Sequence, residues 1–174
     1  YTHISDALSI RSRDTTMSTG DVLDNIEFDR SVIGVNVPVG SHKVTKREIV
    51  AYAEAMGETN PLYLDEEAAK NGPYGTIIAP PGFYHSIRLK QMPDIKLKFG
   101  DRNSGFIGGQ SIEYFEPVRA GDTISATAQV ANVYAKTGRT GTLVFIVRRT
   151  TYSNQHGRTV MIVDGSTVRR GTVK

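Results

Sequence analysis

The chain has 174 residues, a net charge of +3 at pH 7 and no cysteine. Without cysteine it can form neither a disulfide nor a thiolate zinc site, and it cannot use a cysteine nucleophile. Its length fits one domain with a substantial hydrophobic core. No apolar run is long enough to span a membrane, and no N-terminal stretch resembles a signal peptide. We therefore expect a cytoplasmic protein with no membrane partner.

The N-terminal region is polar and lacks hydrophobic periodicity. We expect residues 1–30 to form an arm outside the core, and residues 31–174 to form a single domain. Within that domain, residues 32–39 are apolar but contain glycine and proline, which predicts a short extended segment.

Two short helices are predicted next. Thr45 and Glu48 have the spacing of a capping box, in which each residue satisfies a backbone N–H of the other. Apolar residues at helical spacing follow, and Gly57 is a plausible stop signal. Asp65 is the expected cap of a second helix over residues 66–70.

A third helix is predicted after the Pro80-Pro81-Gly82 segment, because proline is tolerated in the first turn of a helix. Apolar residues between Phe83 and Leu89 suggest that this helix is buried on much of its surface. Met92-Pro93 is its expected end.

The second half of the chain has a period of two, which is typical of β-strands. It begins after a glycine-rich segment, residues 105–109, which we expect to be a loop. Short turns connect the strands, which favours an antiparallel sheet. The predicted strands cover about residues 110–117, 122–135, 141–153 and 158–170. Helices first and strands second is an α+β pattern.

The usual catalytic signatures are absent. There is no nucleophile elbow, no phosphate-binding P-loop and no His-Glu-x-x-His motif. The four histidines have no metal-ligand spacing, so we expect no metal site and no cofactor. His85 lies on the predicted buried helix, and we expect it to be a hydrogen-bonded core histidine.

One denser basic stretch interrupts the otherwise even spread of charge. It is either a solvated face or a patch that binds the phosphates of an anionic ligand. Nucleic-acid-binding proteins cluster their charge more strongly, so we expect no nucleic-acid partner. The stretch comprises Arg88, Lys90, Lys96, Lys98 and Arg102.

Several segments resemble, in the right order, the MaoC-like acyl dehydratases, which are also called (R)-specific enoyl-CoA hydratases. Together they cover about residues 31–170. The Pro-Pro pair at 80–81 resembles the subgroup that forms the N-terminal, often non-catalytic half of double-domain dehydratases. The segments are Gly57-Glu-Thr-Asn-Pro-Leu-Tyr-Leu-Asp65, Ile78-Ala-Pro-Pro-Gly-Phe83, Ile112-Glu-Tyr-Phe-Glu-Pro-Val-Arg-Ala-Gly-Asp122, and the strands 141–151 and 157–170.

The resemblance implies a hot-dog fold, in which an antiparallel sheet wraps a long central helix. It also implies a homodimer, or a heterodimer with a second hot-dog subunit. The implied reaction is the interconversion of 2-enoyl-CoA and 3-hydroxyacyl-CoA, and the substrate is an acyl-CoA or acyl-carrier thioester. The phosphates of coenzyme A would then be a ligand for the basic stretch.

Proton transfer in this family is shared by an Asp and a His five residues apart. The matching positions here hold Glu58 and Tyr63. Glutamate is longer by one methylene, and tyrosine is a poor base at neutral pH. The departure favours a subunit with a degenerate acid–base pair that shapes the acyl pocket beside a catalytic partner. The alternatives are a self-sufficient hydratase that uses Glu58 with Tyr63 as donor, and a hot-dog thioesterase or acyl-binding module.

The family also requires donors for the thioester oxygen, where negative charge develops during the reaction. Because Pro80 and Pro81 lack N–H groups, Gly82 and Phe83 carry the first donors of the predicted helix, unless the segment only starts that helix. Two further expectations concern single residues. Asn60 either caps a turn or contacts substrate, and Gly108 either admits a ligand or makes a bend.

Overall fold

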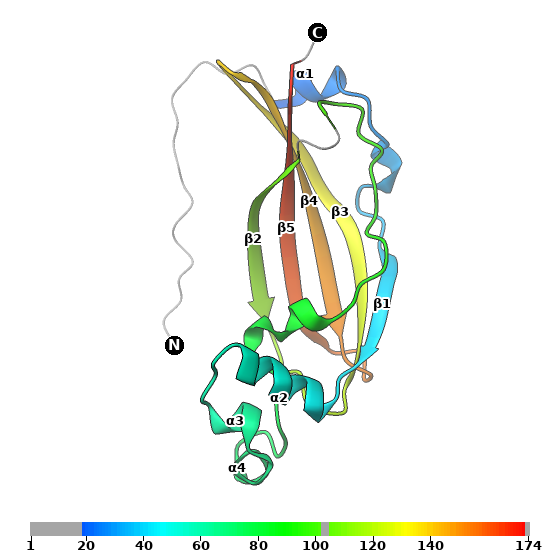
Figure 1. Cartoon of the computed structure of the whole chain (residues 1–174). Helices are drawn as coiled ribbons and strands as arrows, with labels where there is room; N and C mark the ends of the chain where they lie inside the picture. Colours follow the sequence, from blue (N-terminus) through cyan, green and yellow to red (C-terminus); the bar gives the residue numbers. More distant parts are fainter. Residues whose placement is uncertain (1–18, 102–104, 173–174) are drawn as a thin grey trace.

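A five-stranded antiparallel sheet forms the body of the molecule, in the order β1-β3-β4-β5-β2. The computed structural model describes residues 19–101 and 105–172 (Figure 1). The predicted α+β class and antiparallel sheet are confirmed. The strands are β1 (Val37–Lys43), β2 (Phe106–Tyr114), β3 (Thr123–Gly138), β4 (Gly141–Ser153) and β5 (Thr159–Gly171).

The helices gather mostly at one end of the sheet. Figure 1 shows α2, α3 and α4 together at that end and α1 at the other. The predicted capping box is formed at the start of α2, since Thr45 and Glu48 bind each other's backbone N–H. The helices are α1 (Thr19–Asp24), α2 (Lys46–Ala55), α3 (Pro61–Leu64) and α4 (Glu66–Asn71), with 3₁₀ helices η1 (Arg30–Val32) and η2 (Pro81–Ser86).

The central helix is much shorter than expected, because η2 is a single six-residue 3₁₀ segment. After it the chain runs along the sheet toward the α1 end without forming a helix (Figure 1). The Lys90 N–H donates to the carbonyl oxygen of Val39 next to it, so the edge strand β1 satisfies this backbone group. Pro93 also disfavours the helical conformation at Met92. The expectation of a long helix is therefore wrong in this chain.

The glycine-rich segment 105–109 is not a loop, because most of it belongs to β2. Phe106 pairs with Val168 of β5, and the register shifts between Ile107 and Gly109. Such a bulge inserts one extra residue while the rest of the strand stays paired. Pairing with β5 thus overrides the low strand propensity of the glycines.

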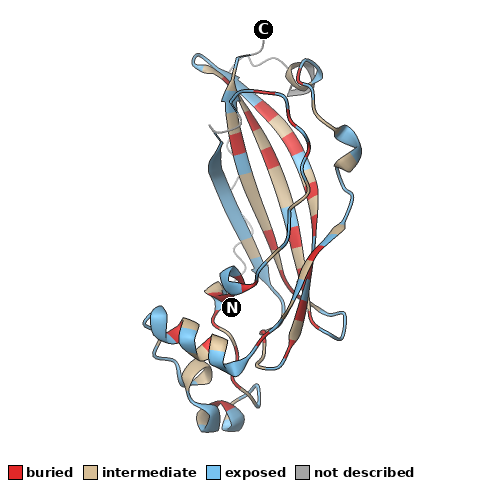
Figure 2. Cartoon of the chain, turned by 45° about the vertical axis from the view of Figure 1, so that its right-hand side comes forward, coloured by how far each residue is buried: buried red, intermediate tan, exposed pale blue. Residues whose placement is uncertain are grey.

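Buried side chains form two clusters on one face of the sheet, here called the inner face, which carries Val144, Ile146, Thr150 and Tyr152 of β4. One cluster surrounds Phe83 of η2. The other lies nearer α1 and contains the inner-face residues Val144 and Ile146. Figure 2 shows buried bands along β3 and β4, while β2 at the sheet edge is exposed almost throughout.

The N-terminal segment takes part in the second cluster. Ile26 is only 2% exposed there, and the carbonyl oxygen of Glu27 accepts a hydrogen bond from the Lys98 N–H. Part of the expected arm therefore contributes to the core. Residues 1–18 of that arm lie outside the described residues.

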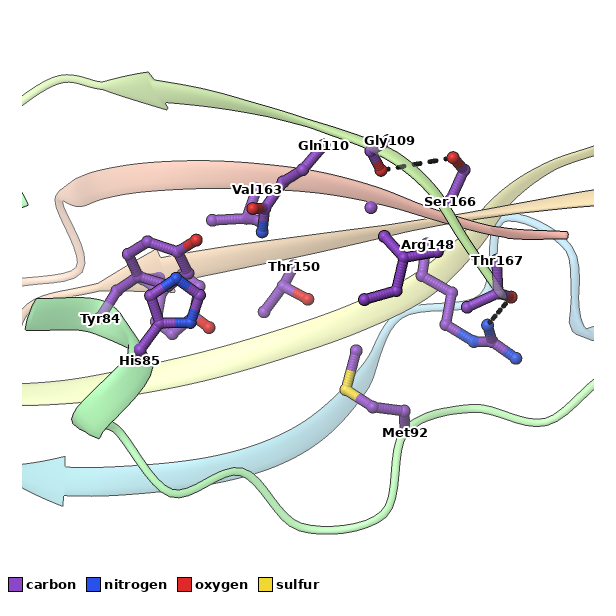
Figure 3. A pocket seen from close by; sticks show the side chains of 13 residues that line it. Tyr84, His85, Met92, Gly109, Gln110, Arg148, Thr150, Val163, Ser166 and Thr167 are labelled. Carbon is purple, nitrogen blue, oxygen red and sulfur yellow. Dashed lines mark hydrogen bonds between the residues drawn. The ribbon is translucent and has the colours of Figure 1, made fainter. Parts of the chain in front are cut away.

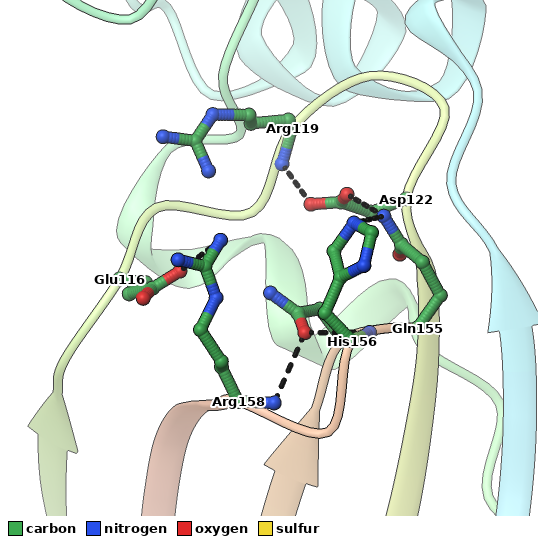
Figure 4. Close-up of polar contacts among 7 residues, drawn as sticks. Glu116, Arg119, Asp122, Gln155, His156 and Arg158 are labelled. Atoms are coloured by element: carbon green, nitrogen blue, oxygen red, sulfur yellow. Dashed lines mark hydrogen bonds and ion pairs between the residues drawn. The ribbon is translucent and has the colours of Figure 1, made fainter.

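Two turns at the α2 end of the sheet are joined by polar contacts (Figure 4). Asp122 is buried, and its carboxylate accepts hydrogen bonds from the Arg119 N–H at 2.8 Å and from Gln155 Nε2 at 3.0 Å. Arg158 and Glu116 form an ion pair at 3.3 Å beside them. These contacts hold in place the turn before β3 and the turn between β4 and β5.

Candidate functional site

A cavity of about 370 Å³ lies between η2, the segment that follows it and the inner face of the sheet (Figure 3). The central helix η2 ends at Ser86 and leaves this part of the inner face uncovered by a helix. Tyr84, His85 and Met92 line one side of the pocket. The opposite side is formed by Arg148, Thr150 and Tyr152 of β4, together with residues of β5 and of the edge strand β2.

Aromatic side chains form the end of the pocket beside η2. The rings of Tyr84 and Tyr152 meet edge to face with centroids 6.4 Å apart, and the His85 ring lies 4.0 Å from that of Tyr84. Burial raises the pKa of Tyr152 to about 12, and Tyr84 adds to the increase. His85 is exposed and lines the pocket, so the expectation of a core histidine is wrong.

Arg148 occupies the other end of the pocket. Its Nε donates to the carbonyl oxygen of Pro93 and its Nη1 to the hydroxyl of Thr167, both at 3.1 Å. Burial lowers the pKa of Arg148, Asp94 acts to raise it, and Arg169 lowers it further. A half-buried guanidinium thus joins the inner face to the segment after η2.

The expected acid–base pair lies outside this pocket. Glu58 follows the C-terminal end of α2, and its N–H donates to the carbonyl oxygen of Ala53 at 2.9 Å. Tyr63 belongs to α3. Both side chains are half-buried, and neither makes a hydrogen bond or ion pair with any other described residue. Asn60 is the N-cap of α3, with its Oδ1 accepting the Leu62 N–H at 3.0 Å, so its side chain has a structural partner.

The two expected oxyanion donors differ from each other. The Phe83 N–H donates to the Pro80 carbonyl oxygen at 2.9 Å in the first turn of η2, so it is not free as expected. The Gly82 N–H has no acceptor among the described residues. The Tyr52 hydroxyl would clash with a Cβ on Gly82, so the close approach that glycine permits is made by this phenol.

Gly108 lies at the bulge of β2 and does not line the pocket. A Cβ at this position would stand 2.6 Å from Cγ2 of Val168 and 2.8 Å from the Ser166 hydroxyl oxygen. This geometry favours a bend at Gly108 over a ligand contact, because side chains of β5 lie close to this residue.

Sequence reasoning missed the β4 side of the pocket. Its signal was present, because Ile146, Arg148, Thr150 and Tyr152 alternate with the outer positions of a predicted strand. An arginine and a threonine at inward positions of such a strand indicate a polar site in the core.

Three further features concern a metal site, a membrane-spanning helix and the basic stretch. Among residues 19–101 and 105–172, no three His, Asp or Glu side chains are grouped closely enough to hold a metal ion. The same residues contain no helix with the length and apolar character needed to cross a bilayer. In the basic stretch, Lys98 pairs with Glu27 at 2.6 Å, while Arg102 lies outside the described residues.

Residues 31–163 match the family described as FAS1-like, dehydratase domain region. The chain belongs to this family. It is 35% identical over 118 residues to a UPF0336 protein of Streptomyces avermitilis, covering 64% of this chain and 77% of that relative. It is 30% identical over 142 residues to a probable enoyl-CoA hydratase alpha subunit of Thermomonospora curvata, covering 72% of this chain and 42% of that protein.

Solved structures share the fold of this family member. The MaoC-like dehydratase of Rhodospirillum rubrum has a TM-score of 0.62 at 20% identity, covering 80% of this chain and 92% of that one. A chain of the ChsH1-ChsH2 complex of Mycobacterium tuberculosis has a TM-score of 0.62 at 17% identity, covering 81% and 85%. The hot-dog fold and the resemblance to MaoC-like dehydratases are therefore confirmed.

Proposed function

We propose that this chain is a subunit of an acyl-thioester hydratase or dehydratase, which interconverts 2-enoyl and 3-hydroxyacyl thioesters of coenzyme A or a carrier protein. In this proposal it shapes the acyl pocket, while a second hot-dog subunit supplies the working acid–base pair. The observation that carries the proposal is the pocket beside η2. It opens where the central helix ends early, and Glu58 and Tyr63 do not line it.

The proton-transfer residues support a degenerate role. A general base needs to reach the proton that it removes and needs a suitable pKa. The Glu58 carboxylate has no partner among the described residues that would orient it, and Tyr63 replaces the histidine that the family uses. The family match and the name of the Thermomonospora curvata relative support hydration or dehydration chemistry.

The edge strand β2 supports a partner. Its outer edge has no strand partner among the described residues, and Phe106, Ile107 and Tyr114 on it are 51%, 84% and 46% exposed. An exposed apolar edge strand readily pairs with another chain. A second hot-dog subunit would cover this edge, as the subunit in the name of the relative and the ChsH1-ChsH2 complex also suggest.

Binding of the thioester oxygen would fall to Gly82. Its N–H faces no acceptor among the described residues, and the Tyr52 hydroxyl lies close to the position that a Cβ on Gly82 would take. An amide and a phenol are both able to donate to a developing oxyanion.

Co-expression with the products of neighbouring genes tests the proposal. The chain alone and any complex that co-purifies with it are assayed for hydration of enoyl-CoA substrates. We expect turnover by the complex and little by the isolated chain. Ordinary enzyme rates from the isolated chain would favour a self-sufficient hydratase, and hydrolysis of acyl-CoA would favour a thioesterase.

A further inference from the structure

The guanidinium of Arg148 is not used by the proposed hydration chemistry. It lies at the end of the pocket away from η2 (Figure 3). Arginine carries five N–H donors. Two of them bind Pro93 and Thr167, and both of these acceptors are neutral oxygens. The remaining donors have no acceptor among the described residues.

No described carboxylate forms an ion pair with this cation. Asp94 favours its charged form from a distance, but does not reach ion-pair range in the described structure. Arg169 is a second cation nearby, and its own Nη1 is buried without a hydrogen-bond partner. A partly buried charge without a counter-ion is unfavourable, and a ligand anion would relieve this cost. The charge of the pocket is therefore complementary to an anionic group.

The walls between the two ends suit an aliphatic chain. Met92 and Val163 line the pocket, and Gly165 leaves open space opposite Arg148. Tyr152 lies four residues from Arg148 on β4, which corresponds to roughly 13 Å along a strand. An acyl chain of medium length therefore fits with one end beside the aromatic residues and its other end beside Arg148.

We propose that the pocket binds an acyl chain that carries a carboxylate at the end far from the thioester, with Arg148 as the partner of that carboxylate. The substrate class is then an ω-carboxyacyl thioester. Guanidinium and carboxylate match in charge and in planar geometry. The inference rests on the proposed function for the thioester end of the ligand. Binding of the acyl chain and its terminal carboxylate can be measured without turnover.

Calorimetric titration of the full chain with decanoate and with decan-1-ol tests the assignment. The two probes share a chain length and differ in charge, and neither contains a thioester. At neutral pH we expect decanoate to bind at least roughly tenfold more tightly, because a charge-assisted hydrogen bond contributes more than a neutral one. Equal affinity for the two probes overturns the proposal.

The variant Arg148→Gln is expected to abolish the preference for decanoate. The matched control is Arg149→Gln. Arg149 is the next residue of β4, faces the other side of the sheet and is paired with Asp164 at 2.7 Å. The control should keep the preference. A preference that survives Arg148→Gln, or is lost equally in the control, overturns the assignment.

Arg148→Gln also removes contacts to Pro93 and Thr167, so a second variant guards against misfolding. A Cβ on Gly165 would meet no atom within 4 Å, so Gly165→Val can fill the pocket without a clash at Cβ. Because the valine side chain would take space needed by the bound chain, it should weaken decanoate binding at least roughly tenfold, with the unfolding transition unchanged. Unweakened binding overturns the proposal. If neither the chain nor any complex that co-purifies with it hydrates enoyl-CoA while decanoate still binds through Arg148, the proposed function fails and the pocket assignment stands.

Discussion

The hydroxyl of Tyr114 donates a hydrogen bond to the carbonyl oxygen of Pro81 at 2.8 Å, which joins the edge strand β2 to the first turn of η2. Burial raises the pKa of Tyr114, and Tyr84 and Tyr52 add to the increase, so this phenol remains a donor above its ordinary titration range. Two tyrosines thus contact the first turn of η2. Tyr114 binds the Pro81 carbonyl, and the Tyr52 phenol packs closely against Gly82.

Replacing Tyr114 with Phe removes this hydrogen bond and keeps the ring. We expect the free energy of unfolding, measured by urea denaturation, to fall by about 1 kcal/mol, because the Pro81 carbonyl loses its donor. Tyr74→Phe is the control, since Tyr74 is exposed and has no hydrogen bond to a described residue. An equal loss in both variants would show that the contact with Pro81 contributes nothing.

Gly82→Ala tests the contact with Tyr52. The new Cβ would collide with the Tyr52 hydroxyl but would lie 3.5 Å from Cζ of the ring. We expect a loss of about 1–3 kcal/mol in unfolding free energy from overpacking. Adding Tyr52→Phe should recover most of this loss, because it removes the colliding atom. A double-mutant cycle with no coupling between the two changes would contradict this geometry.

Tyr152 predicts a pH dependence of stability. Its folded-state pKa is raised from 10.0 to about 12 by burial, so the folded protein holds this proton more tightly than the unfolded chain. The stabilisation is fully present below pH about 10 and is lost as the pH rises toward about 12. As the pH rises from about 9.5 to about 11, the unfolding free energy of the unmodified protein should fall. In Tyr152→Phe this fall should be smaller by about 1 kcal/mol, because the titrating phenol is absent.

Tyr134→Phe provides the comparison for this pH series. Tyr134 is half-buried and stacks on Phe145 at a centroid distance of 4.7 Å, outside the pocket lining. This variant shows how far removal of a phenol outside the pocket changes the profile. Identical profiles for all three proteins would show that Tyr152 does not titrate as its burial requires.

The proposed degeneracy of the acid–base pair, Glu58 and Tyr63, predicts a gain of function on restoring the family residues. The isolated chain should hydrate enoyl-CoA slowly or not at all, since a positioned acid–base group contributes roughly 10²–10⁴ in rate. The double change Glu58→Asp with Tyr63→His should raise kcat, measured by loss of the enoyl absorbance. Ordinary rates in the unmodified chain, abolished by Glu58→Gln, would instead identify Glu58 as a working base.

Local features of this protein follow from the sequence because neighbouring residues make them. The capping box of Thr45 and Glu48 spans four residues, and both its hydrogen bonds are present. The period of two over residues 141–153 predicts β4 within its observed bounds, because side chains of a strand alternate between two faces. The family motifs are likewise short segments that are visible without a fold.

Tertiary contacts decided the features that depend on distant partners. Backbone pairing with Val39 and with β5 replaced, respectively, the part of the expected helix beyond Ser86 and the loop expected at residues 105–109. The pocket exists only because η2 ends before it covers the middle of the sheet. Arg148 meets Pro93, 55 residues away, and such a contact has no local signal. Long-range pairing satisfies backbone groups that local propensity alone leaves undecided, which is why the sequence predicted the sheet but not its binding site.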